Sequence, residues 1–156
     1  MIFPEMIDEA IKPFLDDSSI VVSNLMAPIK TKTEHEDPNE VKVVVDKNNF
    51  ALYFSREPIP SGKKESNDHY MQKQVCIIPF TRDFLLTFNE LEPTPLEVIE
   101  SVDMMRVLEH GYKVKMVPTH FDTYSVDTTD DLKRVEKLLM DDELTRKYPI
   151  LTGYEG

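Results

Sequence analysis

The sequence has 156 residues and a formal net charge of −11, from 29 acidic and 18 basic side chains. This length suits one domain with a buried core, and 40% hydrophobic with 30% charged residues is ordinary for a soluble globular protein. No apolar run approaches the roughly 20 residues of a membrane helix, and the acidic field disfavours non-specific binding to nucleic acid. We therefore expect neither a membrane nor a nucleic acid as a partner.

Two features concern the cellular compartment. The single cysteine, Cys76, cannot form an internal disulfide and fits a reducing environment. The first residues, Met1 to Glu5, lack a basic segment followed by an apolar one, so no signal peptide is expected. The sequence therefore predicts a cytoplasmic protein.

The first part of the chain predicts a helix, a strand and a hairpin. Apolar side chains recur at helical spacing over residues 4–15, where Pro13 is expected to kink or shorten the end. The apolar run 19–25 is typical of a buried strand, and the polar stretch 28–39 is expected to be a loop. Alternating valines, a turn and a second apolar run predict a β-hairpin over residues 41–54.

Beyond the hairpin, residues 59–68 have the composition of a loop, and residues 74–79 are a second candidate for a buried strand. A short helix is expected over residues 81–90. Its inward-facing residues are expected to be Phe84, Leu85 and Phe88.

The last part of the chain predicts two helices around one strand. Pro95 opens a helix that Gly111 would end, and its apolar positions recur at helical spacing: Ile99, Val102, Met105 and Leu108. Residues 112–117 alternate as a strand, and Thr128 with Asp131 predicts the capped start of a final helix. Strands that alternate with helices indicate a single α/β domain over residues 1–156, with one inserted antiparallel hairpin.

The residues by themselves contain few signs of chemistry. There is no glycine-rich phosphate loop, no Cys/His metal spacing and no nucleophile elbow, and the four histidines are expected at the surface or in loops. Arg56 follows a strand, where a guanidinium can clamp a carboxylate or phosphate; the alternative is a surface ion pair with Glu57 or Glu65. Asp127 precedes a helix, where a hard carboxylate suits Mg²⁺; the alternative is stabilisation of the helix dipole.

Five blocks of the sequence, in this order, resemble the CMP-Kdo synthetases, which are 3-deoxy-manno-octulosonate cytidylyltransferases. These blocks are Asp37–Val44, Ala51–Pro60, Pro95–Glu97, Met105–Gly111 and Val126–Thr128. The run Ala51–Pro60 is specific, and its coincidence with four other blocks argues against chance. The resemblance extends over nearly the whole chain.

This resemblance implies an enzyme that couples CTP to the anomeric hydroxyl of a 2-keto-3-deoxy sugar acid and releases pyrophosphate, for lipopolysaccharide biosynthesis. It implies Mg²⁺ as cofactor, a homodimer, and a Rossmann-like nucleotide-diphospho-sugar transferase fold. By similarity, Arg56 contacts the sugar acid and Asp127 is one of two aspartates that hold Mg²⁺. The hairpin 41–54 resembles the part of the family that builds the dimer.

The family carries a Gly-Asp-Glu-Pro segment with the second metal aspartate, and a CTP-binding loop before it, upstream of the point where this chain starts. We therefore expect a partial fold that lacks the N-terminal nucleotide-binding half. Apolar surface is expected where that half would pack. The chain by itself is expected to be inactive.

The acceptor pocket also departs from the family. The family typically has a histidine at Gln74, a tyrosine at Ile78 and a Glu-Gln pair at Asp103-Met104. Ile78 and Met104 remove polar groups that would contact the sugar, and an unpaired polar group costs about 1–3 kcal/mol. Either the acceptor is an acid other than Kdo, or the register across Gln74–Met104 is wrong.

Two other functions remain open from the sequence. One is a non-catalytic dimerisation or interaction module derived from this fold. The other is a nucleotidyltransferase for a different acceptor.

Overall fold

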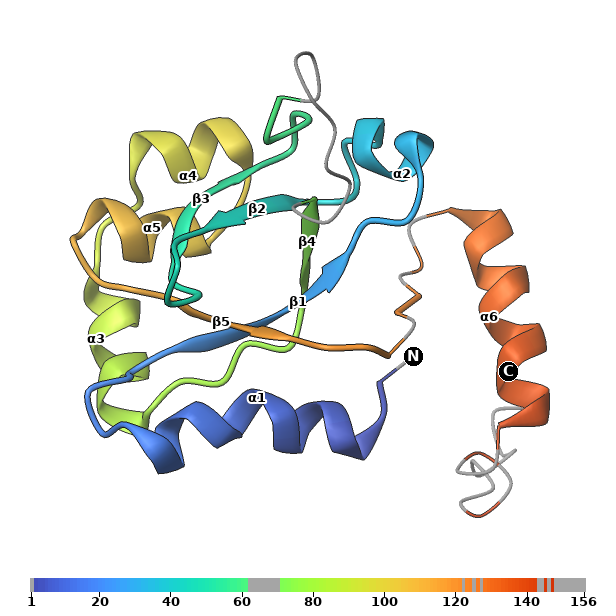
Figure 1. Ribbon diagram of the computed structural model, residues 1–156, viewed down its shortest axis with the longest axis horizontal. Helices are drawn as coiled ribbons and strands as arrows, with labels where there is room; N and C mark the ends of the chain where they lie inside the picture. The colour runs from blue at the N-terminus through green and yellow to red at the C-terminus, as the bar shows by residue number, and fades with distance from the viewer. Residues whose placement is uncertain are drawn as a thin grey trace, which may run out of the picture. The chain divides into compact units, whose positions relative to one another are not determined.

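A computed structural model describes residues 2–61, 71–121, 123–124, 126, 128–142, 145 and 147 (Figure 1). Two compact units are distinguished, residues 2–121 and residues 122–156, and each is described by itself. That the whole chain forms one domain stays a prediction.

The first unit contains five helices and five strands among its described residues. In chain order they are α1 (Pro4–Asp16), β1 (Ser23–Pro28), α2 (Lys32–Glu36), β2 (Lys42–Val45), β3 (Ala51–Ser55), β4 (Gln72–Val75), α3 (Arg82–Glu90), α4 (Pro95–Glu100), α5 (Met104–Glu109) and β5 (Lys115–Pro118). They confirm a mixed α/β fold.

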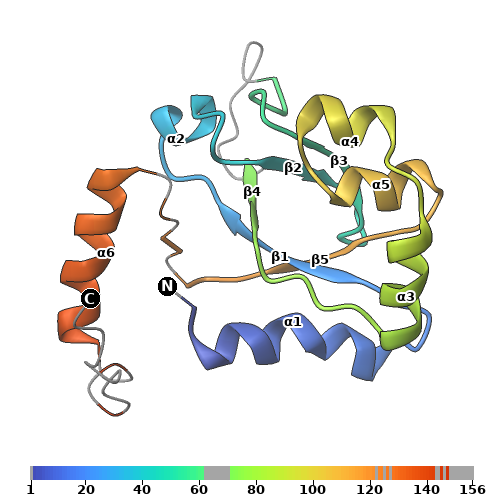
Figure 2. The ribbon, with the colours of Figure 1, turned by 180° about the vertical axis from the view of Figure 1, so that it is seen from behind.

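The described strands form one sheet in the order β3-β2-β4-β1-β5. Only the pair β1–β5 is parallel; β4 is antiparallel to both β1 and β2. Antiparallel pairing therefore extends beyond the predicted hairpin. The reason is that β4 lies between β1 and β2 in the sheet and runs antiparallel to each of them. Figure 2 shows the sheet and its helices from behind.

Helix α1 covers one face of the sheet. It extends to Asp16, so Pro13 does not shorten it, and the N–H of Asp17 donates to the carbonyl of Pro13 at 3.0 Å. The hydroxyl of Ser23 on β1 donates to the carbonyl of Ala10 at 2.6 Å, which joins helix and sheet. The buried cluster between them consists of Met6, Ala10, Leu25, Ala27 and Val75.

The opposite face of the sheet carries the larger core. Helices α3 and α5 pack there, with Phe84 and Val107 against Val43, Phe54 and Met116 (Figure 1). The sheet thus lies between two helical layers, and removing water from both apolar faces supplies the main stabilisation of such folds.

The hairpin turn connects the two edges of the sheet. The Asp46 carboxylate accepts hydrogen bonds from the N–H groups of Asn48 and Phe50, both at 2.8 Å, and Asn49 takes the left-handed conformation with φ 59°. Phe50 then forms a bridge to Lys115 on β5. The edge strands β3 and β5 therefore meet at this end.

Apolar side chains are exposed on the outer side of α1, at helical spacing. Ile7, Ile11 and Leu15 are 49, 41 and 81% exposed. That a nucleotide-binding half covers such a surface stays a prediction.

Two predicted boundaries in the first half of the chain were wrong. Residues Ile20 and Val22 are buried as expected, but the strand begins only at Ser23 and continues to Pro28, because an apolar run shows burial and not the start of hydrogen-bonded pairing. The expected loop 28–39 contains α2, whose N-cap hydroxyl of Thr31 accepts from the N–H of Glu34 at 3.1 Å. This is a capping pattern that the sequence contained.

The long helix expected from Pro95 is two short helices. Ser101 adopts a left-handed conformation with φ 53° and ends α4, so the helical register does not continue into α5. Ile99 is consequently 74% exposed and not inward-facing, whereas Val102 and Met105 are buried. In α3, Leu85 is 43% exposed for a simpler reason: it is rotated about 100° from the buried Phe84.

The described part of the second unit contains α6 (Thr129–Asp141). Its capping box is confirmed, since the hydroxyl of Thr128 and the carboxylate of Asp131 exchange hydrogen bonds with each other's N–H groups, at 3.2 and 3.0 Å. Within the described residues no helix is long and apolar enough to cross a membrane.

Candidate functional site

Arg56 lies just after β3, and its guanidinium contacts three backbone carbonyls. Its Nε donates to Glu100 at 2.9 Å, its Nη1 to Pro38 at 2.8 Å and its Nη2 to Ser101 at 3.1 Å. Among the described residues it makes no ion pair with Glu57, and Glu65 lies outside them. Two of its five N–H groups have no partner in the described part of the chain.

The Glu100 carboxylate holds the same end of β3. It accepts hydrogen bonds from the backbone N–H of Arg56 at 3.0 Å, the hydroxyl of Ser55 at 3.0 Å and the hydroxyl of Tyr53 at 3.0 Å. Burial, together with this carboxylate, raises the pKa of Tyr53. The end of α4 is therefore bound to the strand that carries Arg56.

Two buried lysines fix the neighbouring strands. Lys42 is fully buried, and its ammonium donates to the carbonyls of Asp37 and Arg56; burial lowers the pKa of this group. Lys73 on β4 pairs with Glu34 at 2.7 Å and Glu40 at 3.1 Å. These contacts hold the segments on either side of β2 in one arrangement.

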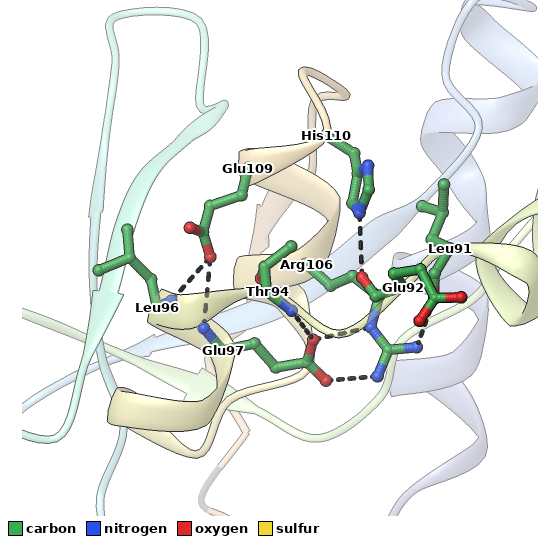
Figure 3. A network of polar contacts seen from close by, with 8 residues as sticks. All are labelled: Leu91, Glu92, Thr94, Leu96, Glu97, Arg106, Glu109 and His110. Carbon is green, nitrogen blue, oxygen red and sulfur yellow. Dashed lines mark hydrogen bonds and ion pairs between the residues drawn. The ribbon is translucent and has the colours of Figure 1, made fainter.

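A polar network joins α4 to α5 (Figure 3). Arg106 donates to both oxygens of the Glu97 carboxylate, through Nε at 2.7 Å and through Nη2. The Glu109 carboxylate accepts from the N–H groups of Leu96 at 3.0 Å and Glu97 at 3.3 Å. The hydrogen bonds that Arg106 donates to Glu97 lower the pKa of the Glu97 carboxyl. The network fixes the junction between the helices, where Ser101 contacts Arg56 and where Asp103 precedes α5.

Gln74 contacts Asn24, which is fully buried on β1. The Nε2 group of Gln74 donates to Oδ1 of Asn24 at 2.6 Å, and Nδ2 of Asn24 donates to the carbonyl of Val75 at 2.6 Å and that of Leu25 at 3.0 Å. The sequence analysis singled out Gln74 but not Asn24, since a lone Asn in an apolar run carries no signal of its own.

The other residues of the predicted acceptor pocket separate into two environments. Ile78 packs against the larger core, and Met104 is 2% exposed inside that core. Asp103 is exposed at the start of α5, and its side chain does not cap the helix. Met104 therefore has almost no surface to offer to a sugar in this arrangement, whereas Arg56 and Asp103 lie at the same junction.

The metal site proposed from the sequence cannot be placed. Asp127 lies outside the described residues. Among the described residues, no group of three or more His, Cys, Asp or Glu side chains could hold a metal ion. One expectation about histidines is wrong: His35 is only 6% exposed, and its Nε2 lies 3.1 Å from the carbonyl oxygen of Ile59.

Residues 1–116 match the sequence pattern of the family described as Cytidylyltransferase. Because this match includes well over half of the chain, the chain belongs to the cytidylyltransferase family.

Within this family, the chain is similar to 3-deoxy-manno-octulosonate cytidylyltransferases. It is 43% identical to that of Geotalea uraniireducens (strain Rf4) over 145 residues, which covers 86% of the chain and 58% of the relative. It is 40% identical to that of Fusobacterium nucleatum subsp. nucleatum over 131 residues, 84% of the chain and 53% of the relative. The chain thus spans less than two thirds of the length of these relatives.

The fold is similar to that of a solved CMP:2-keto-3-deoxy-manno-octonic acid synthetase complexed with CTP. The TM-score is 0.81 at 30% sequence identity, covering 90% of this chain and 57% of that one. The resemblance inferred from the sequence blocks is confirmed by these findings.

Proposed function

We propose that the protein to which this chain belongs transfers a cytidylyl group from CTP to a 2-keto-3-deoxy sugar acid related to Kdo. The observation that carries this proposal is the likeness in fold, at a TM-score of 0.81, to a synthetase for a CMP-linked sugar acid that was solved with CTP. The sequence identity of 43% to a 3-deoxy-manno-octulosonate cytidylyltransferase supports the same substrate class.

The proposed reaction is a substitution at phosphorus. The anomeric hydroxyl oxygen of the acid forms a bond to the α-phosphorus of CTP, and the bond from that phosphorus to the β,γ-pyrophosphate breaks. Pyrophosphate leaves with the electron pair of that bond, and the hydroxyl proton passes to solvent. Positioning and charge stabilisation are the main contributions that a protein makes to such a step.

Arg56 is the residue proposed to recognise the acid. Three of its N–H groups are occupied by backbone carbonyls, which hold the guanidinium in one orientation. The remaining two could donate to a carboxylate without any rearrangement of these contacts. The proposed recognition therefore needs no movement of β3.

Mg²⁺ belongs to the proposal because it would balance the charge of the triphosphate in a chain that is itself acidic, with net charge −11. Asp127 is the proposed ligand. Among the described residues, no group of three or more His, Cys, Asp or Glu side chains could hold the ion. We therefore assign no step of the reaction to it.

The acceptor is proposed to be an acid other than Kdo itself. The support comes from two positions at which the resemblance implies polar side chains: Ile78 packs against the larger core, and Met104, 2% exposed inside that core, offers almost no surface to a sugar. Neither side chain can hydrogen-bond a sugar hydroxyl. An acceptor that has no hydroxyl group at these two positions would avoid the cost of leaving a sugar hydroxyl without a hydrogen bond.

A homodimer is proposed through the hairpin formed by β2 and β3. Leu52 is 62% exposed on the edge strand β3. An exposed apolar side chain on an edge strand is suited to a contact with a second copy of the chain. An interaction module without catalysis would use the same surface, so activity must be measured separately.

The function is tested by release of pyrophosphate from the full-length protein with CTP, Mg²⁺ and a panel of 2-keto-3-deoxy sugar acids that includes Kdo. We expect release with CTP and at least one acid, and none when UTP or ATP replaces CTP. The absence of release with every acid would refute the proposed activity and leave the interaction module.

A further inference from the structure

Lys42 and Lys73 are two buried lysines that lie opposite each other in the pairing of β2 with β4. Their ammonium groups have different partners. Lys73 forms ion pairs with two carboxylates. Lys42 donates instead to two neutral backbone carbonyls, that of Asp37 at 2.8 Å and that of Arg56, and within the described part of the chain it forms no ion pair. Only the charge of Lys73 is therefore in direct contact with an opposite charge.

The two environments change the pKa of the two lysines in opposite directions. Burial lowers the pKa of Lys42, and nearby carboxylates do not offset this effect. Burial also acts to lower the pKa of Lys73, but the hydrogen bonds and charges of its two carboxylates outweigh burial and raise that pKa. A lysine whose pKa is lower in the folded than in the unfolded state makes the fold less stable while it is charged. The charge of Lys42 therefore does not serve the stability of the fold.

The contacts of Lys42 lie on both sides of the Arg56 guanidinium. The ammonium donates to the backbone carbonyl of Arg56 and to the carbonyl of Asp37. The guanidinium of Arg56 donates through Nη1 to the carbonyl of the next residue, Pro38, at 2.8 Å. The two cations thus join the same two segments of the chain, and together they close a ring of contacts.

The position of the Lys42 ammonium is itself fixed by the sheet. Lys42 is paired with Ser55, the last residue of β3, so its backbone cannot shift relative to the residue that follows, Arg56. The Asp37 carbonyl also accepts the N–H of Glu40 at 3.2 Å and does not need a second donor for its own hydrogen bonding. What the ammonium adds is a fixed spacing between Asp37 and Arg56.

We propose that Lys42 is a positioning residue that holds the guanidinium of Arg56 in the orientation in which it receives the carboxylate of the sugar acid. The role of Arg56 in binding the acid rests on the proposed function. The effect of Lys42 on Arg56 does not, and it can be measured without a substrate. Lys42 itself does not touch the acid, because it is fully buried and its ammonium faces backbone carbonyls.

Lys42→Met tests the positioning in the full-length protein without a substrate. Methionine keeps the apolar stem of the side chain and removes the ammonium. The NMR signal of the Arg56 Nε–H, assigned by its loss in Arg56→Lys, reports through its exchange with water how firmly the guanidinium is held. We expect this exchange to become about tenfold faster in Lys42→Met, since opening becomes easier by about the contribution of one hydrogen bond. An unchanged exchange rate would overturn the proposal.

The melting temperature tests whether the ammonium serves the fold instead. Lys42→Met should change it by less than about 3 °C, because the loss of two carbonyl contacts is offset by the removal of a buried charge. Lys73→Met is the matched variant and should lower it by about 6 °C or more, because two carboxylates lose their partner. An equal fall in both variants, or a Lys42→Met protein that does not fold, would refute a positioning role.

Pyrophosphate release connects the positioning to the acid, with the acid of the panel that gives the highest kcat/KM as the probe. Lys42→Met is expected to raise the KM for the acid about tenfold and to change kcat and the KM for CTP less than about twofold. In an Arg56→Met background the same substitution should not change kcat/KM further, because Lys42 acts only through Arg56. An equal effect in both backgrounds would contradict the proposal.

Ser23→Ala is the control for the loss of a buried contact from a side chain to a carbonyl. The hydroxyl of Ser23 donates to the carbonyl of Ala10, and Ser23 is as buried as Lys42. This variant should leave the KM for the acid and the exchange of the Arg56 Nε–H unchanged. An increase in that KM equal to the one in Lys42→Met would show a general effect of destabilisation and would overturn the proposal.

Failure of the proposed function and failure of this inference give different results. If the wild-type protein releases no pyrophosphate with any acid, the proposed function fails, and the part of the inference that concerns the acid fails with it. The exchange of the Arg56 Nε–H then still decides whether Lys42 holds Arg56. An active wild type whose KM for the acid is unchanged in Lys42→Met refutes the role of Lys42 and leaves the proposed function intact.

Discussion

Arg56 donates two hydrogen bonds to Glu100, one from its backbone and one from its side chain. The backbone N–H of Arg56 donates to the carboxylate of Glu100 at 3.0 Å, and the Nε of Arg56 donates to the backbone carbonyl of Glu100 at 2.9 Å. The side chain of each residue thus holds the backbone of the other. This relationship links the end of β3 to the end of α4, at the place where recognition of the acid is proposed.

Arg56→Lys is expected to lower the free energy of unfolding of the 156-residue chain by about 1–3 kcal/mol. A lysine ammonium cannot donate in the three fixed directions of a guanidinium, so at least one carbonyl contact is lost. Urea denaturation measures the change. The control is Arg82→Lys, since Arg82 is largely exposed and its ion pair within the described part of the chain is with exposed Asp83 at 3.3 Å; its effect should stay within about 0.5 kcal/mol. Equal effects of both variants would contradict the structural role of Arg56.

Glu97 is expected to make the stability of the chain depend on pH in the acidic range. The hydrogen bonds from Arg106 lower the pKa of Glu97 below its ordinary value of 4.5. A carboxyl whose pKa is lower in the folded state stabilises the fold above the unfolded pKa, and this contribution is lost as the pH falls through the folded pKa. The wild type should therefore lose stability from about pH 4.5 downward.

Glu97→Gln tests this origin directly. At pH 7 the variant should be less stable by about 2 kcal/mol, because it loses charge-assisted hydrogen bonds to Arg106. The difference from the wild type should shrink below about pH 4.5. Exposed Glu90→Gln is the control and should change the stability at pH 7 by less than about 0.5 kcal/mol. A difference between Glu97→Gln and wild type that is the same at pH 3 and pH 7 would exclude the pair as the cause.

Leu52→Lys is expected to weaken self-association of the chain. The proposed dimer uses the hairpin, and a charge on the edge strand β3 opposes pairing with a second copy. Analytical ultracentrifugation at tens of micromolar should detect dimers of the wild type and at least a tenfold larger dissociation constant for the variant. Leu86→Lys, at a 51% exposed position on α3, should leave the dimer intact. A monomeric wild type at that concentration would refute the proposed dimer.

Asp127→Asn separates a metal ligand from a residue that only stabilises a helix. In the full-length protein, loss of a ligand should raise the barrier by about 3 kcal/mol, on the order of a hundredfold in rate. If Asp127 acts only on the helix dipole, turnover should stay near normal and stability should fall by less than about 1 kcal/mol. The control is Asp130→Asn in the first turn of α6, which changes the same helix charge. Pyrophosphate release and melting temperature, measured on both variants, decide between the two roles.

Several elements were predictable because their signals are local. The helix at residues 4–15, the turn at Asp46–Asn49 and the cap formed by Thr128 and Asp131 each depend on residues a few positions apart. Helical spacing, turn residues and capping residues act within one or two turns of the chain. The family could also be predicted, since its motif blocks are contiguous.

The candidate site was predicted only in part, because its contacts join distant segments. Nothing in the sequence near Arg56 indicates that its guanidinium contacts Pro38 and Ser101, 18 and 45 positions away. The pairing of Asn24 with Gln74 joins residues 50 positions apart.

The sequence by itself determined the type of most helices and strands, though not α2 or the break at Ser101, and the family to which the chain belongs, because these depend on local patterns and contiguous motifs. Only the tertiary structure decided which faces of the elements are buried. Met104 is buried and Ile99 exposed because Ser101 breaks the helix between them, and the packing of α5 on the sheet then selects the buried side. Burial depends on what packs from elsewhere in the chain, and for that reason the spacing of apolar residues could not predict it.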